Sequence, residues 1–215
     1  LFTDLTVGRL GSEDIRYLDG EIAELIIFNN ENEASRIKIE SYLATKYGIS
    51  INDGTGVNYI ASDSTTIFWN RNNNNGYNYD IFGIGKDDIS TLNQKQSRSV
   101  NSDAFFSVYL LPIATDDLPT TNQLNTTSFE ADKSFLMFEN NNDSIQRWST
   151  NTTMPSQFKY RLKRVWKFQK TGTVNNAVIS ISNTDLPVNT GTLPIYMLIS
   201  DSPDMTNANY YEMTL

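Results

Sequence analysis

The stretch Tyr17-Leu-Asp-Gly-Glu-Ile-Ala-Glu-Leu-Ile-Ile-Phe-Asn29 decides how this chain of 215 residues is organised. From Ile22 to Phe28 the residues are apolar except for one glutamate. A short apolar run of this kind, ended by asparagines, predicts a strand that is buried on both faces. The pattern changes directly beyond it, so the stretch marks the end of one structural segment and the start of another.

The segment 32–47 repeats its apolar residues with the period of a helix. Ile39, Leu43 and Tyr47 recur every fourth residue, and most positions between them are polar. This spacing predicts an amphipathic α-helix whose apolar stripe packs on a sheet. Gly48 follows directly and is the expected end of the helix. We therefore expect a stiff connector between two domains.

The rest of the chain predicts an all-β fold, a jelly-roll-like β-sandwich. Short apolar or alternating runs are separated by clusters of Asn, Gly, Asp and Pro, which form turns. Expected strands lie at 59–61, 66–69, 81–86, 90–100, 105–111, 134–140, 160–170, 176–182 and 193–200. Two further strands are expected at 1–8 and 21–28, and a last one is indicated after 210. The domain boundaries that follow are 1–30, 31–50 for the connector helix and 51–215 for the sandwich.

Several motifs occur in an order that resembles a family of large secreted proteins of the Bacteroidota. They are the strand above, Ile39-Glu-Ser-Tyr-Leu-Ala-Thr-Lys-Tyr-Gly-Ile49, Tyr79-Asp-Ile-Phe-Gly-Ile-Gly-Lys-Asp-Asp88, Leu92-Asn-Gln-Lys-Gln-Ser97, Asp132-Lys-Ser-Phe-Leu-Met-Phe138 and Arg164-Val-Trp-Lys-Phe168. In that family a laminin-G/concanavalin-like jelly roll ends in such a strand, and a helix and a β-rich module follow. The resemblance implies that 1–30 are the terminal strands of a lectin-like domain. It also implies an extracellular, cell-surface, adhesin-like setting, with neighbouring domains of the same polypeptide as partners.

The composition excludes several kinds of function. The net charge of −8 argues against nucleic acid as a partner. No apolar run is long enough to cross a membrane, so no membrane insertion is expected. The chain contains neither histidine nor cysteine, which removes the Ser–His–Asp relay, thiol nucleophiles and the usual zinc and copper sites. Hydrolysis by paired carboxylates would need residues such as Asp80, Asp87, Asp88 and Glu139, and no spacing among them singles out such a pair. We expect no enzyme activity and no cofactor other than possible calcium.

Asp87 and Asp88 directly follow the strand expected at 81–86. One interpretation is a calcium site, which requires several converging oxygen ligands. The simpler interpretation is a solvated turn after a strand.

Aromatic residues flank the Asn-rich loop around 72–75. Trp69, Tyr77 and Tyr79 could stack against sugar rings, and Trp148 in a polar surround is a second candidate. Alternatively, Trp69 and Tyr79 belong to the core and Trp148 closes one end of the sandwich. The basic residues at 159–170 form either a solvated face or a contact for an acidic polysaccharide.

The resemblance also implies O-glycosylation at Asp63-Ser64-Thr65 and Asp143-Ser144-Ile145, with Ser64 and Ser144 as acceptors. Taken together, the residues and the resemblance predict a non-catalytic structural or adhesion module that presents loops or spaces domains; that it belongs to a large exported protein is what the resemblance implies. The alternative is a carbohydrate-binding accessory module of a secreted polysaccharide-degrading enzyme, with surface glycans or polysaccharide as ligands. Buried tryptophans would favour the former, and exposed aromatics in a concave patch the latter.

Overall fold

A computed structural model describes residues 6–8, 17–28, 33–101, 103–148, 154–182, 184–186 and 194–214. The chain divides into two compact units, Leu1–Asn32 and Glu33–Leu215. The helix thus belongs to the larger unit. No helix in the described ranges is long and apolar enough to cross a membrane.

The smaller unit differs from the expectation of two strands. No strand forms at 6–8 or 17–28, and the rest of the expected first strand, 1–5, lies outside the described residues. Leu18 donates a backbone hydrogen bond to Gly8 O at 2.7 Å. The apolar side chains from Ile22 to Phe28 are largely exposed; Ile27, for example, is 64% exposed. The described part of the unit offers this run no partner strand, and an unpaired segment cannot form a ladder.

The helix α1 spans Glu33–Tyr47, as expected, and Gly48 ends it with a φ of 66°. Its most buried residues, however, are Ser41, Ala44 and Thr45, whereas the expected stripe is only half-buried. Small side chains allow the helix to approach the sheet closely. Ser41 Oγ donates to Ile37 O and accepts from the backbone N–H of Ile60 at 3.0 Å, so a polar residue satisfies a strand end at the interface.

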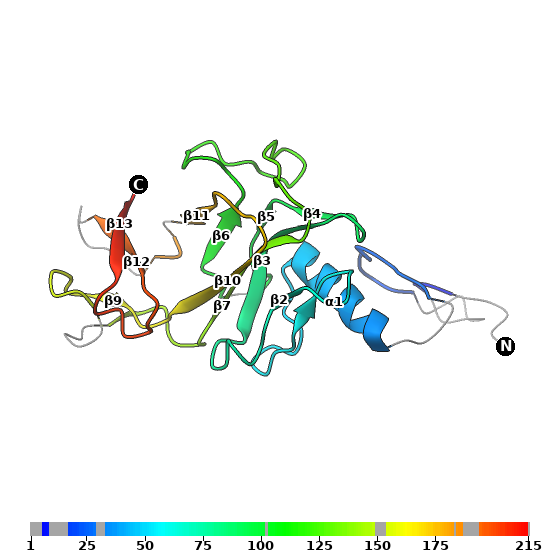
Figure 1. Ribbon diagram of the computed structural model, residues 1–215, viewed down its shortest axis with the longest axis horizontal. Coiled ribbons are helices and arrows are strands. Elements are labelled where there is room, and N and C mark those ends of the chain that lie inside the picture. The colour runs from blue at the N-terminus through cyan, green and yellow to red at the C-terminus, as the bar shows by residue number, and fades with distance from the viewer. Residues whose placement is uncertain are drawn as a thin grey trace. The chain divides into compact units, whose positions relative to one another are not determined.

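The strands form antiparallel sheets, which confirms the all-β prediction. Their bounds are β1 Tyr59–Ile60, β2 Ile67–Trp69, β3 Tyr79–Asp87, β4 Leu92–Gln94, β5 Gln96–Ser97, β6 Phe106–Tyr109, β7 Ser134–Asn140, β8 Arg147–Trp148, β9 Arg161–Leu162, β10 Trp166–Thr171, β11 Val178–Ile181, β12 Ile195–Ile199 and β13 Asn209–Met213. One sheet has the order β10-β7-β3-β4 and another β11-β6-β5, and three pairs, β1-β2, β8-β9 and β12-β13, complete the set (Figure 1).

The two larger sheets pack face to face as a sandwich. Phe82 of β3 and Phe138 of β7 meet Phe106 and Val108 of β6 in one buried cluster. Phe106 lies edge-on to Phe138, with ring centroids 5.3 Å apart. Strand β7 is buried along its whole length because both of its faces are covered.

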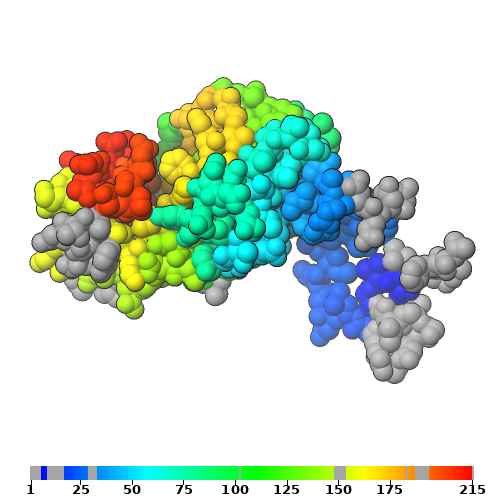
Figure 2. Space-filling model, turned by 60° about the horizontal axis from the view of Figure 1, so that its bottom comes forward, coloured from blue at the N-terminus to red at the C-terminus, as the bar shows by residue number. Residues whose placement is uncertain are grey.

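The opposite face of β7 and β3 carries a second core under α1 and the β1-β2 pair. Phe135 stacks on Phe68 with centroids 4.0 Å apart, and Tyr59 and Trp69 are fully buried beside them. In Figure 2 the light-blue helix and the cyan β1-β2 region adjoin on this side. The larger unit therefore has three layers, with the β10-β7-β3-β4 sheet in the middle.

Two expected strands are broken in the structure. The run 90–100 becomes β4 and β5, which are edge strands of different sheets, so the chain turns a corner near Lys95. The run 160–170 becomes β9 and β10, because Arg164 between them leaves the ladder to make buried polar contacts. Strand β7, by contrast, has the expected bounds.

Candidate functional site

A concave feature lies along the corner between β4 and β5. Two cavities of about 300 and 380 Å³ adjoin there, and Lys46, Gln94 and Asn122 line both of them. We call them together the corner groove. One wall is the last turn of α1, the floor is the segment 91–98, and the other wall is the loop 120–123.

The loop wall is held by asparagine side chains that bond the corner backbone. Asn122 Oδ1 accepts from Lys95 N at 2.6 Å, and Asn122 Nδ2 donates to Asn93 O at 2.8 Å. Asn125 is fully buried and donates to the carbonyls of Lys95 and Leu110. These hydrogen bonds attach the long connection after β6, drawn in green above the sheets in Figure 1, to the floor of the groove.

The helix wall is aromatic and cationic. Lys46 Nζ donates to Tyr42 Oη at 2.7 Å and lies 5.0 Å from the Tyr42 ring centroid and 5.5 Å from that of Tyr47. Beyond the helix, Gly48 O accepts from Val100 N at 3.0 Å, which fixes the end of α1 against the corner segment.

The charged side chains that line the groove are basic, and one of them is ion-paired. Among the described residues that line it, Lys46, Lys95 and Arg98 are basic, and none is acidic. Lys95 Nζ donates to the neutral carbonyl of Asn125. Arg98 forms an ion pair with Asp185 at 2.9 Å. The groove thus combines cations with the amides of the floor.

One atom of the floor is incompletely satisfied. Gln96 Oε1 is buried and has no hydrogen-bond partner in the described structure. The neighbouring Gln94 uses its amide to donate to Gln96 O at 2.6 Å. A buried acceptor without a donor costs on the order of 1–3 kcal/mol, and because this atom is enclosed, a ligand could reach it only if the floor rearranged.

Trp69 is not a ligand platform. Its side chain is fully buried in the core under α1, with no face available for stacking. In the short strand β2, Phe68 and Trp69 are both buried and Ile67 is exposed, so burial does not follow simple alternation there. The prediction that Trp69 binds sugar is therefore wrong, and the alternative that it packs in the core is confirmed.

The other aromatic candidates are not assembled into a platform around Trp69. Tyr77 and Tyr79 are half-buried, and Lys167 Nζ lies 5.8 Å from the Tyr77 ring centroid. For Trp148 the structure describes the backbone, in β8, but not the side chain. The Asn-rich loop is held by a hydrogen bond to β10. Its Asn74 is buried and donates to Gln169 Oε1 at 2.9 Å.

Calcium binding at Asp87 and Asp88 stays a prediction, and the structure gives each of these carboxylates a lysine partner. Asp87 is 2% exposed, accepts from Ser62 N and Oγ, and is paired with Lys133 at 2.8 Å. The ammonium of Lys133 therefore occupies the position that a cation would take. Asp88 is exposed and lies 3.3 Å from Lys86 Nζ. Among the described residues, no group of three or more possible metal ligands converges. The solvated-turn interpretation is wrong for Asp87, because this carboxyl is buried.

The remaining acidic candidates have separate roles. Asp80 is buried and is bonded by Asn101 and by Asn140 Nδ2 at 2.6 Å. Asp80 and Asp87 lie at opposite ends of β3, about 20 Å apart at the usual rise per residue. Glu139 is fully buried in β7, and both of its carboxylate oxygens lack a partner in the described structure.

Both expected glycosylation acceptors lie at exposed turns. Ser64 has a φ of 66° and accepts from Lys38 Nζ at 3.0 Å. Ser144 Oγ accepts from Gln146 N at 3.1 Å. Their modification stays a prediction.

The corner groove was missed by sequence reasoning, although one signal was present. Residues 93–98 are all polar within a segment expected to be a strand, which is unusual for a sandwich strand with one buried face. Arg164, 7% exposed and 2.7 Å from Asp103 Oδ2, was noted only as one basic residue among several.

Comparisons with known proteins place the chain in a family but not in a functional class. None of the curated proteins matches it. None of the solved structures matches it either. A family model does match over residues 35–215, which is most of the chain and nearly all of the larger unit, and the chain therefore belongs to the family described as Domain of unknown function (DUF8202).

Proposed function

We propose that this chain is a non-catalytic structural or adhesion module of a large exported cell-surface protein. The observation that carries the proposal is the engagement of the candidate carboxylates. Asp80 and Asp87, the acids most suitably placed at strand ends, are buried in contacts with Asn140 and Lys133. Breaking such a buried contact is costly, so a carboxylate held in this way is not available to a substrate.

Polar contacts with at least one buried partner also join segments that lie far apart in the chain. Lys133 is bonded to Asp87, which is 46 residues earlier. Arg164 is bonded to Asp103, which is 61 residues earlier. Such contacts resist local unfolding, which suits a module that spaces or presents other domains. The motif order seen in the sequence supports an exported setting.

Localisation tests this proposal directly. Antibodies raised against the purified chain should label intact cells of the producing organism, and brief protease treatment should remove the label. Labelling only after the cells are permeabilised would contradict the exported setting. Release of reducing sugar from polysaccharides by the purified chain would contradict the non-catalytic assignment.

A second function, carbohydrate binding, is favoured by the corner groove. Its amides, hydroxyls and tyrosines are the groups that proteins use to hold sugars. A glycan array probed with the purified chain tests it, with Gln94→Ala as the variant because Gln94 lines both cavities. Binding lost in a folded variant would support this function, whereas an array with no bound glycan would leave the structural role.

A further inference from the structure

We infer that Asn75 is a site of spontaneous deamidation, in which the backbone nitrogen of Gly76 displaces the amide group of the Asn75 side chain. This modification is independent of the functions proposed above. It is carried by the residue pair itself, by its exposure, and by the hydrogen bonds that hold the other asparagines of the same loop.

The reaction needs only the chain and water. The Gly76 nitrogen forms a bond to the side-chain carbonyl carbon of Asn75, and its proton ends on the displaced amide group, which leaves as ammonia. Water then opens the resulting succinimide ring at either of its two carbonyls. The product is aspartate or isoaspartate, in which the backbone runs through the former side-chain carbonyl.

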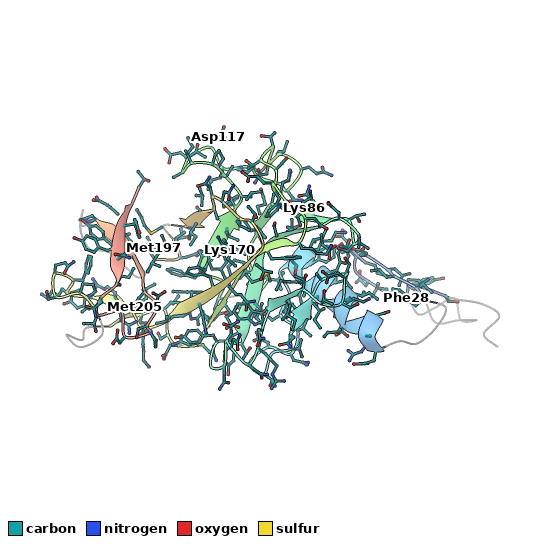
Figure 3. All side chains as sticks on the ribbon, viewed as in Figure 1. Phe28, Lys86, Asp117, Lys170, Met197 and Met205 are labelled. Carbon is teal, nitrogen blue, oxygen red and sulfur yellow. The ribbon has the colours of Figure 1, made fainter. Side chains whose placement is uncertain are left out.

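The pair is accessible and unbonded. It lies in the Asn-rich loop between β2 and β3, whose side chains project at the lower edge of the view in Figure 3. Asn75 and Gly76 are both exposed, so water and base reach them. Among the described residues, neither the Asn75 side chain nor the Gly76 N–H has a hydrogen-bond partner. A Cβ at Gly76 would meet nothing within 4 Å, so the ring has room to close.

The other asparagines between 70 and 75 are held. Asn70, Asn72 and Asn73 each precede a residue whose N–H is already a donor. The donors and acceptors are Arg71 N to Asn58 Oδ1 at 3.0 Å, Asn73 N to Asn70 Oδ1 at 3.1 Å and Asn74 N to Asn70 O at 3.1 Å. Each of these nitrogens must give up its hydrogen bond before it can attack. Asn74 is itself buried, and its amide donates to Gln169. The structure therefore leaves Asn75 as the reactive asparagine of this segment.

A second glycine pair supplies a matched control. Asp53 also precedes a glycine, but Gly54 N donates to Asn78 O at 2.6 Å, and Asp53 Oδ1 accepts from Asp80 N at 2.8 Å. Asp53→Asn would reproduce the Asn75 pair at this bonded position, because an amide oxygen can accept the same hydrogen bond. The two positions then differ in the engagement of the attacking nitrogen and not in the residue pair.

Deamidation would alter the loop in charge and in length. Each event adds one negative charge to a chain whose net charge is already −8. Isoaspartate also lengthens the backbone beside Asn74, whose hydrogen bond to Gln169 Oε1 attaches the loop to β10. Because no enzyme is needed, the converted fraction rises with the age of the molecule.

The test is to incubate the full chain carrying Asp53→Asn in mildly alkaline buffer and to follow its peptides by mass spectrometry. The peptide with Asn75 should gain the mass that replaces NH2 by OH, and isoaspartyl methyltransferase should label it. In the folded chain, position 53 should convert at least about fivefold more slowly than Asn75, because its attacking nitrogen must first break a hydrogen bond. In urea the two positions should convert at similar rates. Circular dichroism confirms that the variant is folded.

Three outcomes would overturn the inference. If Asn75 converts in urea but not in the folded chain, the loop holds the pair in an unreactive geometry. If both positions convert equally fast in the folded chain, the hydrogen bonds do not select the site. If Asn72 or Asn73 converts as fast as Asn75 in the wild-type chain, the modification is not specific to Asn75.

Discussion

Lys133 Nζ lies 2.8 Å from Asp87 Oδ1, and this buried ion pair joins the last residue of β3 to the residue that precedes β7. Ser62 adds two hydrogen bonds to the same carboxylate, from the turn after β1. Three segments therefore meet at one charge, which fixes the middle sheet against the β1-β2 layer.

Removing the cation of this pair should destabilise the fold. Lys133→Met leaves the Asp87 carboxylate buried without its ammonium partner and should lower the free energy of unfolding by about 3 kcal/mol. Urea denaturation followed by circular dichroism measures it. Lys86→Met is the control, because it breaks the pair with exposed Asp88 and should cost less than about 1 kcal/mol. Similar losses in both variants would contradict a structural role for Asp87.

The same pair predicts loss of stability in acid. Burial alone would raise the pKa of the Asp87 carboxyl, but the hydrogen bonds from Lys133 and Ser62 outweigh it and hold the pKa below its usual value. The stability from this group is therefore present above the pKa of the unfolded chain and is lost as the pH falls through the folded pKa. The urea concentration at the denaturation midpoint of the wild type should decrease once the pH drops below about 4. That of Lys133→Met should decrease less over the same range. If the midpoints of the two proteins changed in parallel with pH, Asp87 would not be the group responsible.

Glu139 predicts the opposite pH dependence. Burial raises the pKa of its carboxyl to about 10, and nearby Lys167 opposes only part of the rise. Since the folded state keeps a proton that the unfolded chain releases, the stability from this group is full below the unfolded pKa. It is lost as the pH rises toward the folded value, with a slope of up to about 1.4 kcal/mol per pH unit. Urea midpoints between about pH 5 and about pH 9 should decline in the wild type.

The matched variant for this effect is Glu139→Gln, which keeps the shape and cannot ionise. Its midpoints should change little over the same range, so the two curves should separate as the pH rises. If the wild type and the variant declined together, Glu139 would not be the group responsible.

The sandwich was predictable because its strands are apolar or alternating runs separated by clusters of turn-forming residues. Strand β7 is apolar except near its ends, so its length and burial followed from the pattern alone. The face of α1 was not predictable in the same way. Ser41 and Thr45 are buried because they bond backbone groups at a close contact, and hydrophobic periodicity does not register small polar residues.

The sites were less predictable, because each is built from distant segments. The partner of Asp87 is 46 residues away, so the Asp87-Asp88 pair alone pointed to a turn and, less strongly, to a metal site, but not to a buried ion pair. The corner groove combines residues near 46, 95 and 122. Only the change of sheet at Lys95 brings these together, and no local spacing encodes it.

Trp69 should act as a core residue in any assay. Trp69→Ala removes a fully buried indole and should lower the free energy of unfolding by about 3–5 kcal/mol. Tyr77→Ala, at a half-buried position beside the same loop, should cost clearly less. Thermal denaturation of both variants measures the difference. A Trp69→Ala variant as stable as the wild type would contradict the packing of this core.

Gly48 should tolerate no side chain. Its φ of 66° favours glycine, and an added Cβ would collide with the carbonyl oxygen of Arg98. Gly48→Ala should therefore lower the free energy of unfolding by more than about 2 kcal/mol, from backbone strain together with the collision. Gly76 separates the two effects: its φ is 88°, but a Cβ there would meet nothing within 4 Å, so Gly76→Ala should cost only the strain, about 1 kcal/mol. Denaturant titration of both variants gives the difference, and equal costs would mean that the end of α1 does not pack closely on the corner segment.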